Sequence, residues 1–226
     1  MRASLDTNVI IHLYRAGCQN LLFKYFTTGV YVYEQIRIIE LEHHGKDIIE
    51  LVDKDISSGR IELYTDKRLR DLAVYGIFEW NVKENKCLYG PGDLGEVYAI
   101  SLAQTLGTSC FVTDDTKQGG PYMSLMQFED EVMPFTYADV LLLSYLTGLC
   151  DEIQTVEYFN RINSVSELNW SFQSQIARFI KRFFQDPYRK EDVEWMAELV
   201  KEQGIKVRSK FEKLKKEIRS TGNEQL

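Results

Sequence analysis

Short β-type segments alternate with helical segments over the first 150 residues, and this alternation restricts the fold more than any other feature. Strands are expected near residues 2–5, 30–33, 60–65, 109–113 and 132–136, with helical patterns between them. Strands that are separated by helices form parallel sheets covered by helices. The sequence therefore predicts an α/β fold with a doubly wound, mainly parallel sheet flanked by helices.

The β-type segments stop near residue 151, and the rest of the chain has amphipathic helical patterns. We expect breaks in these helices at Asp186-Pro187 and at Gly204, since Pro and Gly end helices. Phe179, Phe183 and Phe184 are expected on the apolar face of a packed helix. The predicted organisation is a domain over residues 1–150 followed by an α-helical C-terminal extension over residues 151–226.

Charge is distributed unevenly along the chain. The net charge is −7, whereas residues 177–226 carry thirteen Lys and Arg against nine Asp and Glu. An acidic total speaks against broad electrostatic capture of nucleic acid. A local basic helix, or a pocket of carboxylates that binds cations, is compatible with that total.

No apolar run approaches the roughly 20 residues that cross a bilayer, and the beginning of the chain lacks the apolar core of a signal peptide. The chain is therefore expected to be cytoplasmic, with no membrane partner. Its four cysteines are widely spaced and form no Cys-x-x-Cys pair. We expect reduced, half-buried thiols, with neither a zinc site nor a disulfide framework.

The first notable carboxylate is Asp6, in the segment Leu5-Asp6-Thr7-Asn8 between the first expected strand and a helix. Asp, Thr and Asn are good helix caps, because their side chains accept hydrogen bonds from free backbone N–H groups. The carboxyl end of a central strand is also where open α/β sheets bind ligands. Asp6 alone is compatible with both roles.

A second carboxylate, Glu40, follows the next expected strand. On a helix that begins after Tyr33, the residues Ile36, Ile39 and Glu40 share one face. A carboxylate among apolar residues is costly unless it is paired. Glu34 points about 120° away and is expected to be a first-turn charge that is favourable to the helix dipole.

The segment "GPGDLGEVYAISLAQTLG" supplies a third acidic position. Glu96, Ile100 and Ala103 share one helical face, so that a carboxylate again lies at the end of an apolar stripe. Asp93 and Glu96 also have the spacing of an acidic capping box. Capping alone would account for both residues.

Two adjacent carboxylates, Asp114 and Asp115, follow an apolar strand in "SCFVTDDTKQGG". Together with the other acids they would repel one another unless a cation neutralised them. Oxygen ligands favour hard ions. The sequence therefore predicts a site for Mg²⁺ or Mn²⁺.

These segments resemble the PIN-domain ribonucleases, especially the toxins of bacterial type II toxin–antitoxin pairs. The resemblance covers residues 1–148 and depends on the order and spacing of several motifs. The motifs are "LDTNVII", "VYEQIRIIEL", "GEVYAISLAQTLG" followed by "CFVTDD", and "VMPFTYADVLLLSYL". The resemblance implies a PIN-like fold for the first domain, to which the helical extension is an addition.

The resemblance also implies roles for individual residues. The catalytic and metal-binding carboxylates would be Asp6, Glu40, Glu96 and Asp115. Asp114 would be a further metal-binding residue, in the outer shell or at a second ion. The supporting residues would be Asn8, Thr113 and Asp93, of which Asp93 is the alternative to Glu96 as the third acid. His12, His43 and His44 lack the spacing of metal ligands and are expected at the surface or half-buried.

The implied activity is Mg²⁺-dependent endoribonuclease action, by the toxin of a toxin–antitoxin pair. A metal-bound water would attack an RNA phosphodiester in line. The expected partners are RNA as substrate, with an antitoxin protein and a second copy of the chain as candidates. The alternatives are a PIN-like nuclease that acts on structured DNA or on one dedicated RNA, and a catalytically silent PIN-fold binding module. The basic run over residues 206–216 would either contact phosphates or form a solvated face.

Overall fold

The computed structural model describes residues 1–89, 94–127, 131–187 and 189–221. The chain forms two compact units, Met1–Tyr137 and Ala138–Leu226. The segment over residues 138–150, which the sequence assigned to the first domain, belongs to the second unit. The proposed division at residue 150 into two domains stays a prediction. Among the described residues, no helix has both the length and the apolar character to cross a bilayer.

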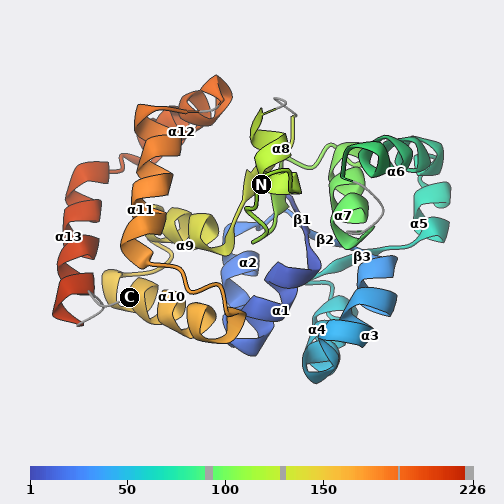
Figure 1. The fold of residues 1–226 in the computed structure, drawn as a ribbon, viewed down its shortest axis with the longest axis horizontal. Coiled ribbons are helices and arrows are strands. Elements are labelled where there is room, and N and C mark those ends of the chain that lie inside the picture. The colour runs from blue at the N-terminus through green and yellow to red at the C-terminus, as the bar shows by residue number, and fades with distance from the viewer. Residues whose placement is uncertain (90–93, 128–130, 188, 222–226) are drawn as a thin grey trace. The chain divides into compact units, whose positions relative to one another are not determined.

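The first unit is built on a five-stranded parallel sheet (Figure 1). Its strand order is β3-β2-β1-β4-β5. The strands are β1 (Ala3–Leu5), β2 (Val30–Tyr33), β3 (Glu62–Tyr64), β4 (Cys110–Val112) and β5 (Met133–Phe135). The direction in which successive strands are added reverses between β1 and β4. In such sheets, ligands bind outside the carboxyl ends of the strands at this switch point.

All five strands lie within the predicted segments, so the α/β prediction is confirmed. The central strand, β1, shows why the strands could be recognised in the sequence. Ala3, Ser4 and Leu5 of β1 are fully buried between β2 and β4, and a strand covered on both faces is almost wholly apolar. The one polar side chain, Ser4, donates a hydrogen bond to the backbone oxygen of Ala99 at 2.7 Å.

Helices make the connections between the strands. They are α1 (Thr7–Arg15), α2 (Asn20–Tyr25), the π-helix η1 (Ile36–Glu40), α3 (Leu41–His44), the 3₁₀-helix η2 (Lys46–Ile48), α4 (Ile49–Ser57), α5 (Asp66–Asp71), α6 (Tyr75–Tyr89), α7 (Leu94–Thr105) and α8 (Pro121–Gln127). Helix α7 contacts β1, β2 and β4, and α6 packs against α7. Because α7 crosses the switch point, its first turn lies beside the carboxyl ends of the central strands.

The second unit is helical. Its elements are α9 (Tyr137–Leu146, from Ala138 onward), α10 (Glu152–Ser166), α11 (Phe172–Ile180), the π-helix η3 (Lys181–Gln185), α12 (Lys190–Gln203) and α13 (Val207–Ser220). The predicted breaks at Asp186-Pro187 and Gly204 are confirmed. A further break, between α10 and α11, was not predicted. There Glu167 and Asn169 adopt positive φ angles of 56° and 52°, which residues other than Gly rarely adopt.

Five charged side chains form an ionic network inside the second unit: Asp139, Arg178, Arg182, Arg189 and Asp192. Arg182 donates from Nε to Asp192 Oδ2 at 2.6 Å, and Asp192 is fully buried. Asp139 Oδ2 lies 3.6 Å from a nitrogen of Arg178 and 3.9 Å from one of Arg182. The network joins α9, α11, η3 and α12.

Phe179 and Phe183 are buried beside this network, with their ring centroids 4.7 Å apart. The prediction that these residues form the apolar face of a packed helix is confirmed for Phe179 and Phe183, whereas Phe184 is half-buried. Phe179 also packs edge-on against Phe211 of α13, at 6.1 Å between centroids. The buried face of α13 consists of Phe211, Leu214 and Ile218.

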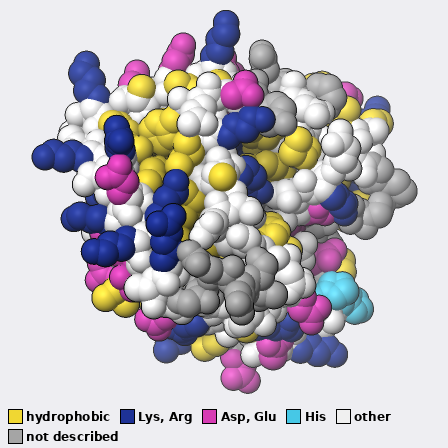
Figure 2. All heavy atoms as spheres, turned by 60° about the vertical axis from the view of Figure 1, so that its left-hand side comes forward, with side chains coloured by type: hydrophobic (Ala, Val, Ile, Leu, Met, Phe, Trp, Pro, Cys, Tyr) yellow, Lys and Arg dark blue, Asp and Glu magenta, His cyan; other side chains and the backbone are white. Residues whose placement is uncertain are grey.

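The opposite face of α13 is exposed and mainly basic. Figure 2 brings forward the side of the molecule that carries α13 and shows many Lys and Arg side chains there, with some Asp and Glu among them. The exposed basic residues of this helix are Arg208, Lys213, Lys215, Lys216 and Arg219. Arg208 forms a solvent-exposed pair with Glu212 at 3.0 Å. The role of this surface in RNA binding stays a prediction.

The four cysteines are free thiols, as predicted. Cys18, Cys110 and Cys150 are buried more completely than expected, because each lies in or beside an apolar core. Cys87 differs from the expectation in the other direction, since it is exposed on α6.

Candidate active site

A polar cavity of about 320 Å³ lies in the first unit, where β1 ends and α7 begins. Its lining residues are Asp6, Thr7, Asn8, Glu40, His44, Leu94, Gly95, Glu96, Asp115 and Lys117. Four of these residues are the carboxylates to which the resemblance assigned catalysis. The structure thus brings together Asp6, Glu40, Glu96 and Asp115, which are far apart in the sequence.

Asp6 both caps a helix and faces the cavity. It is the N-cap of α1, and its Oδ1 accepts a hydrogen bond from the Thr7 N–H at 2.6 Å. Its Oδ2 accepts one from Thr113 Oγ1 at 3.0 Å. Burial raises the pKa of the Asp6 carboxyl from 3.8 to about 7, and the negative charges of Asp114 and Asp115 add to the rise, whereas the two hydrogen bonds oppose it. A buried carboxylate near two others is therefore a defining property of this site.

Thr113 connects the ends of the two central strands. Its buried hydroxyl donates to Asp6 and accepts a hydrogen bond from the Asp115 N–H at 3.1 Å. This bond turns the chain after β4 so that Asp115 lines the cavity. Thr113 therefore lies beside the predicted acids, and its supporting role stays a prediction.

Asp114 faces away from the cavity lining. Its Oδ2 lies 2.7 Å from His12 Nδ1, and its Oδ1 accepts a hydrogen bond from the Tyr137 N–H at 2.9 Å. Asp114 is buried and contributes its charge to the field at Asp6. Its position fits an outer-shell role better than direct contact with an ion in the cavity.

Glu40 reaches the cavity from a helix that differs from the predicted one. Ile36–Glu40 is a π-helix, in which the Leu41 N–H bonds to the Ile36 carbonyl oxygen five residues earlier. Ile36 and Leu41 are consequently the buried pair, whereas Ile39 is 45% exposed. The prediction that Ile39 and Glu40 share an apolar face was wrong, because the extra residue per turn rotates Ile39 outward. Such π-bulges are frequent at functional sites.

Glu34 also has a different partner from the predicted one. Its carboxylate accepts a hydrogen bond at 2.8 Å from the N–H of Asp66, the first residue of α5. The Glu34 carboxylate therefore stabilises the N-terminus of α5 through a direct hydrogen bond. This bond connects the segments that follow β2 and β3. Glu34 does not line the cavity.

Glu96 is buried in the first turn of α7, with Ile100 and Ala103 buried on the same face as predicted. Asp93, the alternative third acid, lies outside the described residues. The choice between the two acids therefore stays a prediction. Asn8 is exposed and lines the cavity.

Gly95 permits close packing between α7 and two residues of the site. A Cβ atom at this position would lie 3.1 Å from Thr7 Oγ1 and 3.3 Å from Glu40 Cγ. Any larger residue would push Glu40 or the helix aside. Gly95 was not singled out from the sequence, although its place directly before Glu96 was a signal.

We expect Gly95→Ala to weaken Mn²⁺ binding to the metal-free protein on the order of tenfold, which equals about 1.4 kcal/mol. The new methyl group crowds Glu40, while the gain in helix propensity offsets the crowding in the folded state. Isothermal titration calorimetry measures the affinity. Gly76→Ala on α6 is the matched control, since nothing lies within 4 Å of its Cβ position. Equal Mn²⁺ affinity in both variants would contradict this role for Gly95.

Two further polar residues beside the acids, Lys117 and His44, were also missed. Lys117 lines the cavity, and its Nζ lies 2.6 Å from Asp115 Oδ2. His44 lines it as well, at the end of α3, and the expectation that it is exposed is confirmed. His12 is half-buried, as expected, and its Nδ1 lies 2.7 Å from Asp114 Oδ2. Spacing in the sequence gave no signal for His12, because it meets Asp114 through the fold, whereas Lys117 is only two residues from Asp115.

Whether the site fits a divalent cation depends on its donors. No group of three or more His, Cys, Asp or Glu side chains, among the residues that the structure describes, is arranged to hold a metal ion directly. Mg²⁺ in proteins keeps several waters and is commonly bound by one or two carboxylates. Thr7 Oγ1 is buried, and no described residue forms a hydrogen bond with it. A polar cavity with oxygen donors and this Thr7 hydroxyl fits a hydrated Mg²⁺ or Mn²⁺.

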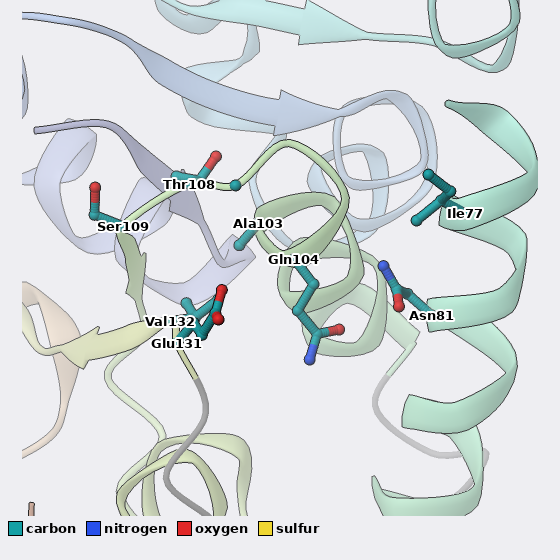
Figure 3. Close-up of a pocket in the computed structure, with 9 residues that line it drawn as sticks. Ile77, Asn81, Ala103, Gln104, Thr108, Ser109, Glu131 and Val132 are labelled. Carbon is teal, nitrogen blue, oxygen red and sulfur yellow. The ribbon is translucent and has the colours of Figure 1, made fainter. Parts of the chain in front are cut away.

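A second, larger cavity of about 500 Å³ lies at the opposite, amino-terminal edge of β4 and β5. Figure 3 shows the side chains of Glu131, Gln104 and Asn81 around it, with Ile77, Ala103 and Val132 as its apolar part. It contains one carboxylate and none of the predicted site residues. The predicted site residues therefore meet at the smaller, acidic cavity and not at the larger one.

Comparisons with protein-family models, with curated proteins and with solved structures found no match to this chain. An assignment of function must therefore be argued from the residues and their geometry.

Proposed function

We propose that this chain is a PIN-like, metal-dependent endoribonuclease and the toxin of a toxin–antitoxin pair. The observation that carries the proposal is the meeting of Asp6, Glu40, Glu96 and Asp115 at one cavity. This cavity lies at the switch point of a parallel sheet, where such folds bind ligands. The order of the motifs along the sequence supports the PIN-like assignment.

Each residue of the site has a distinct role in this proposal. Asp6 and Asp115 offer carboxylate oxygens from the ends of β1 and β4, and Thr113 fixes their relative position. Glu40 and Glu96 add negative charge from two helices. Asp114 holds His12 and the N-terminus of α9 behind them. A bound Mg²⁺ or Mn²⁺ would supply an activated water and compensate charge on the scissile phosphate.

The charge of the site agrees with this use. Carboxylates that repel one another lower the folding stability of a metal-free protein. A module that only bound a partner would be more stable if these acids were replaced. Lys117 and His44 beside the acids provide positive or neutral contacts for an anionic substrate. These features favour catalysis over a silent binding module.

The test is a cleavage assay with the purified full chain. We expect cleavage of single-stranded RNA with Mg²⁺ or Mn²⁺, none with EDTA, and little cleavage of DNA with the same base sequence. Induced expression of the chain should also arrest bacterial growth. RNA binding without cleavage in either metal would contradict the proposal and favour the binding module, whereas preferential DNA cleavage would replace RNA as the substrate class.

A further inference from the structure

Lys117 is attached to Asp115 at two points. The Lys117 ammonium lies 2.6 Å from Asp115 Oδ2, and the Lys117 backbone N–H donates to Asp115 Oδ1 at 3.1 Å. The backbone is held by a tight turn, since the Gly120 N–H bonds to the Lys117 carbonyl oxygen at 3.0 Å. The Lys117 side chain is nevertheless 61% exposed, against 15% for Asp115. The Lys117 side chain therefore has open space around it into which it can turn, whereas the Asp115 carboxylate is mostly enclosed.

The Lys117 ammonium and a divalent cation would compete for the Asp115 carboxylate. An ammonium at 2.6 Å compensates the carboxylate with one positive charge. A divalent cation attracts the same carboxylate more strongly, and it repels the ammonium. Lys117 would then leave Asp115, and its flexible four-carbon chain would keep it within the cavity that both residues line.

We propose that Lys117 is the internal counter-ion of Asp115 in the metal-free protein and becomes a contact for an RNA phosphate once a divalent cation occupies Asp115. This inference rests on the proposed nuclease function. It explains why Lys117 lies at the same cavity as four carboxylates. It also predicts that metal and RNA bind more favourably together than separately, because the metal releases the group that holds the phosphate.

The first test measures Mn²⁺ affinity of the metal-free full chain by calorimetry, without RNA. We expect Lys117→Gln to bind Mn²⁺ about threefold to tenfold more tightly, because the competing ammonium is gone. Lys117→Arg should bind like the wild type. Lys83→Gln, which removes an exposed charge on α6 outside the cavity, is the matched control and should also be unchanged.

An unchanged or weaker Mn²⁺ affinity in Lys117→Gln would overturn the inference. A wild-type protein that binds no Mn²⁺ would instead remove the proposed function, so the two failures are distinguishable. Circular dichroism of each variant checks that the fold is retained. A merely structural role for Lys117 would not tighten metal binding.

The second test measures affinity for a short oligo-uridylate in Ca²⁺, with electrophoresis to verify that the RNA is intact. We expect Lys117→Gln to bind the RNA several-fold more weakly and to lose about 0.7 from the slope of log affinity against log salt, the value for one phosphate contact on a single strand. Lys117→Arg should keep the slope of the wild type. An unchanged slope in Lys117→Gln would overturn the phosphate contact.

Discussion

Asp6→Asn is expected to reduce metal-dependent RNA cleavage by about a thousandfold or more, since it removes a charge that a divalent cation and its activated water require. Asn has nearly the same shape and can still accept the hydrogen bond from the Thr7 N–H. Loss of activity would therefore reflect charge rather than misfolding. Initial rates with single-stranded RNA in Mg²⁺ and in Mn²⁺ measure the effect.

The matched control is Glu131→Gln, which neutralises an exposed carboxylate at the opposite edge of the sheet. This variant should cleave RNA like the wild type. Full activity of Asp6→Asn in Mg²⁺ would contradict the proposed mechanism. Equal losses in both variants would indicate that net charge, rather than the cavity at the switch point, governs activity.

The same variant has a stability effect whose sign depends on pH. In the metal-free protein the pKa of Asp6 is raised to about 7 by burial, so the folded state keeps a proton that the unfolded state loses above pH 3.8. The stability from this proton is present at low pH and is lost as pH rises through about 7. At pH 8 we expect metal-free Asp6→Asn to be more stable than the wild type by on the order of 4 kcal/mol, since the pKa is raised by about three units.

This difference should shrink as pH falls toward 4, and thermal unfolding followed by circular dichroism measures it. Mn²⁺ at pH 8 should raise the melting temperature of the wild type and not that of Asp6→Asn, because a ligand stabilises the state that binds it. A wild-type protein that is as stable at pH 8 as at pH 5 without metal would show that Asp6 carries no such penalty.

The sheet could be predicted from the sequence because burial on both faces leaves a simple signal. The strands are short apolar segments, and Gly or polar turns separate them from helices. The strand order is a property of the whole fold and was not predicted. It is this order that places the end of β1 beside the end of β4, and hence Asp6 beside Thr113.

The acids of the site were predictable, and their surroundings were not. Each acid follows a strand or ends an apolar stripe, which is a local pattern. The π-helix that carries Glu40 has no comparable signal, because the spacing of Ile36 and Ile39 is that of an ordinary helix. The pairs His12–Asp114 and Lys117–Asp115 differ in how far apart the two partners lie along the sequence. His12 is 102 residues from Asp114, so only the fold reveals the contact.

In the second unit, apolar spacing predicted helices and the breakers Pro187 and Gly204 predicted two of their ends. The turn over residues 167–171 lacks both kinds of breaker and depends on side-chain capping. Ser171 accepts a hydrogen bond from the Ser174 N–H, and Asn163 Oδ1 accepts one from the Trp170 N–H. Local side-chain hydrogen bonds, rather than Pro or Gly, therefore stabilise this turn.

Asp192→Asn is expected to destabilise the second unit by about 3–5 kcal/mol, the usual effect of breaking a buried ion pair by removing one partner. Asp192 is fully buried and receives the Arg182 Nε–H at 2.6 Å, while Arg189 Nε lies 3.7 Å away. The substitution would remove the carboxylate that lies beside Arg182 and Arg189 and leave Asp139 beside Arg178 and Arg182. Urea unfolding followed by circular dichroism measures the loss.

Glu212→Gln is the control, because its pair with Arg208 is largely exposed and exposed pairs contribute little. Replacing both Arg182 and Asp192 by apolar residues of similar volume should recover much of the loss, since the cost of burying charge disappears with the charges. A stable Asp192→Asn protein would mean that other groups satisfy Arg182. Recovery of stability in the double variant would show that the buried charges are not needed for net stability. The network would then serve to specify how α9, α11 and α12 pack together.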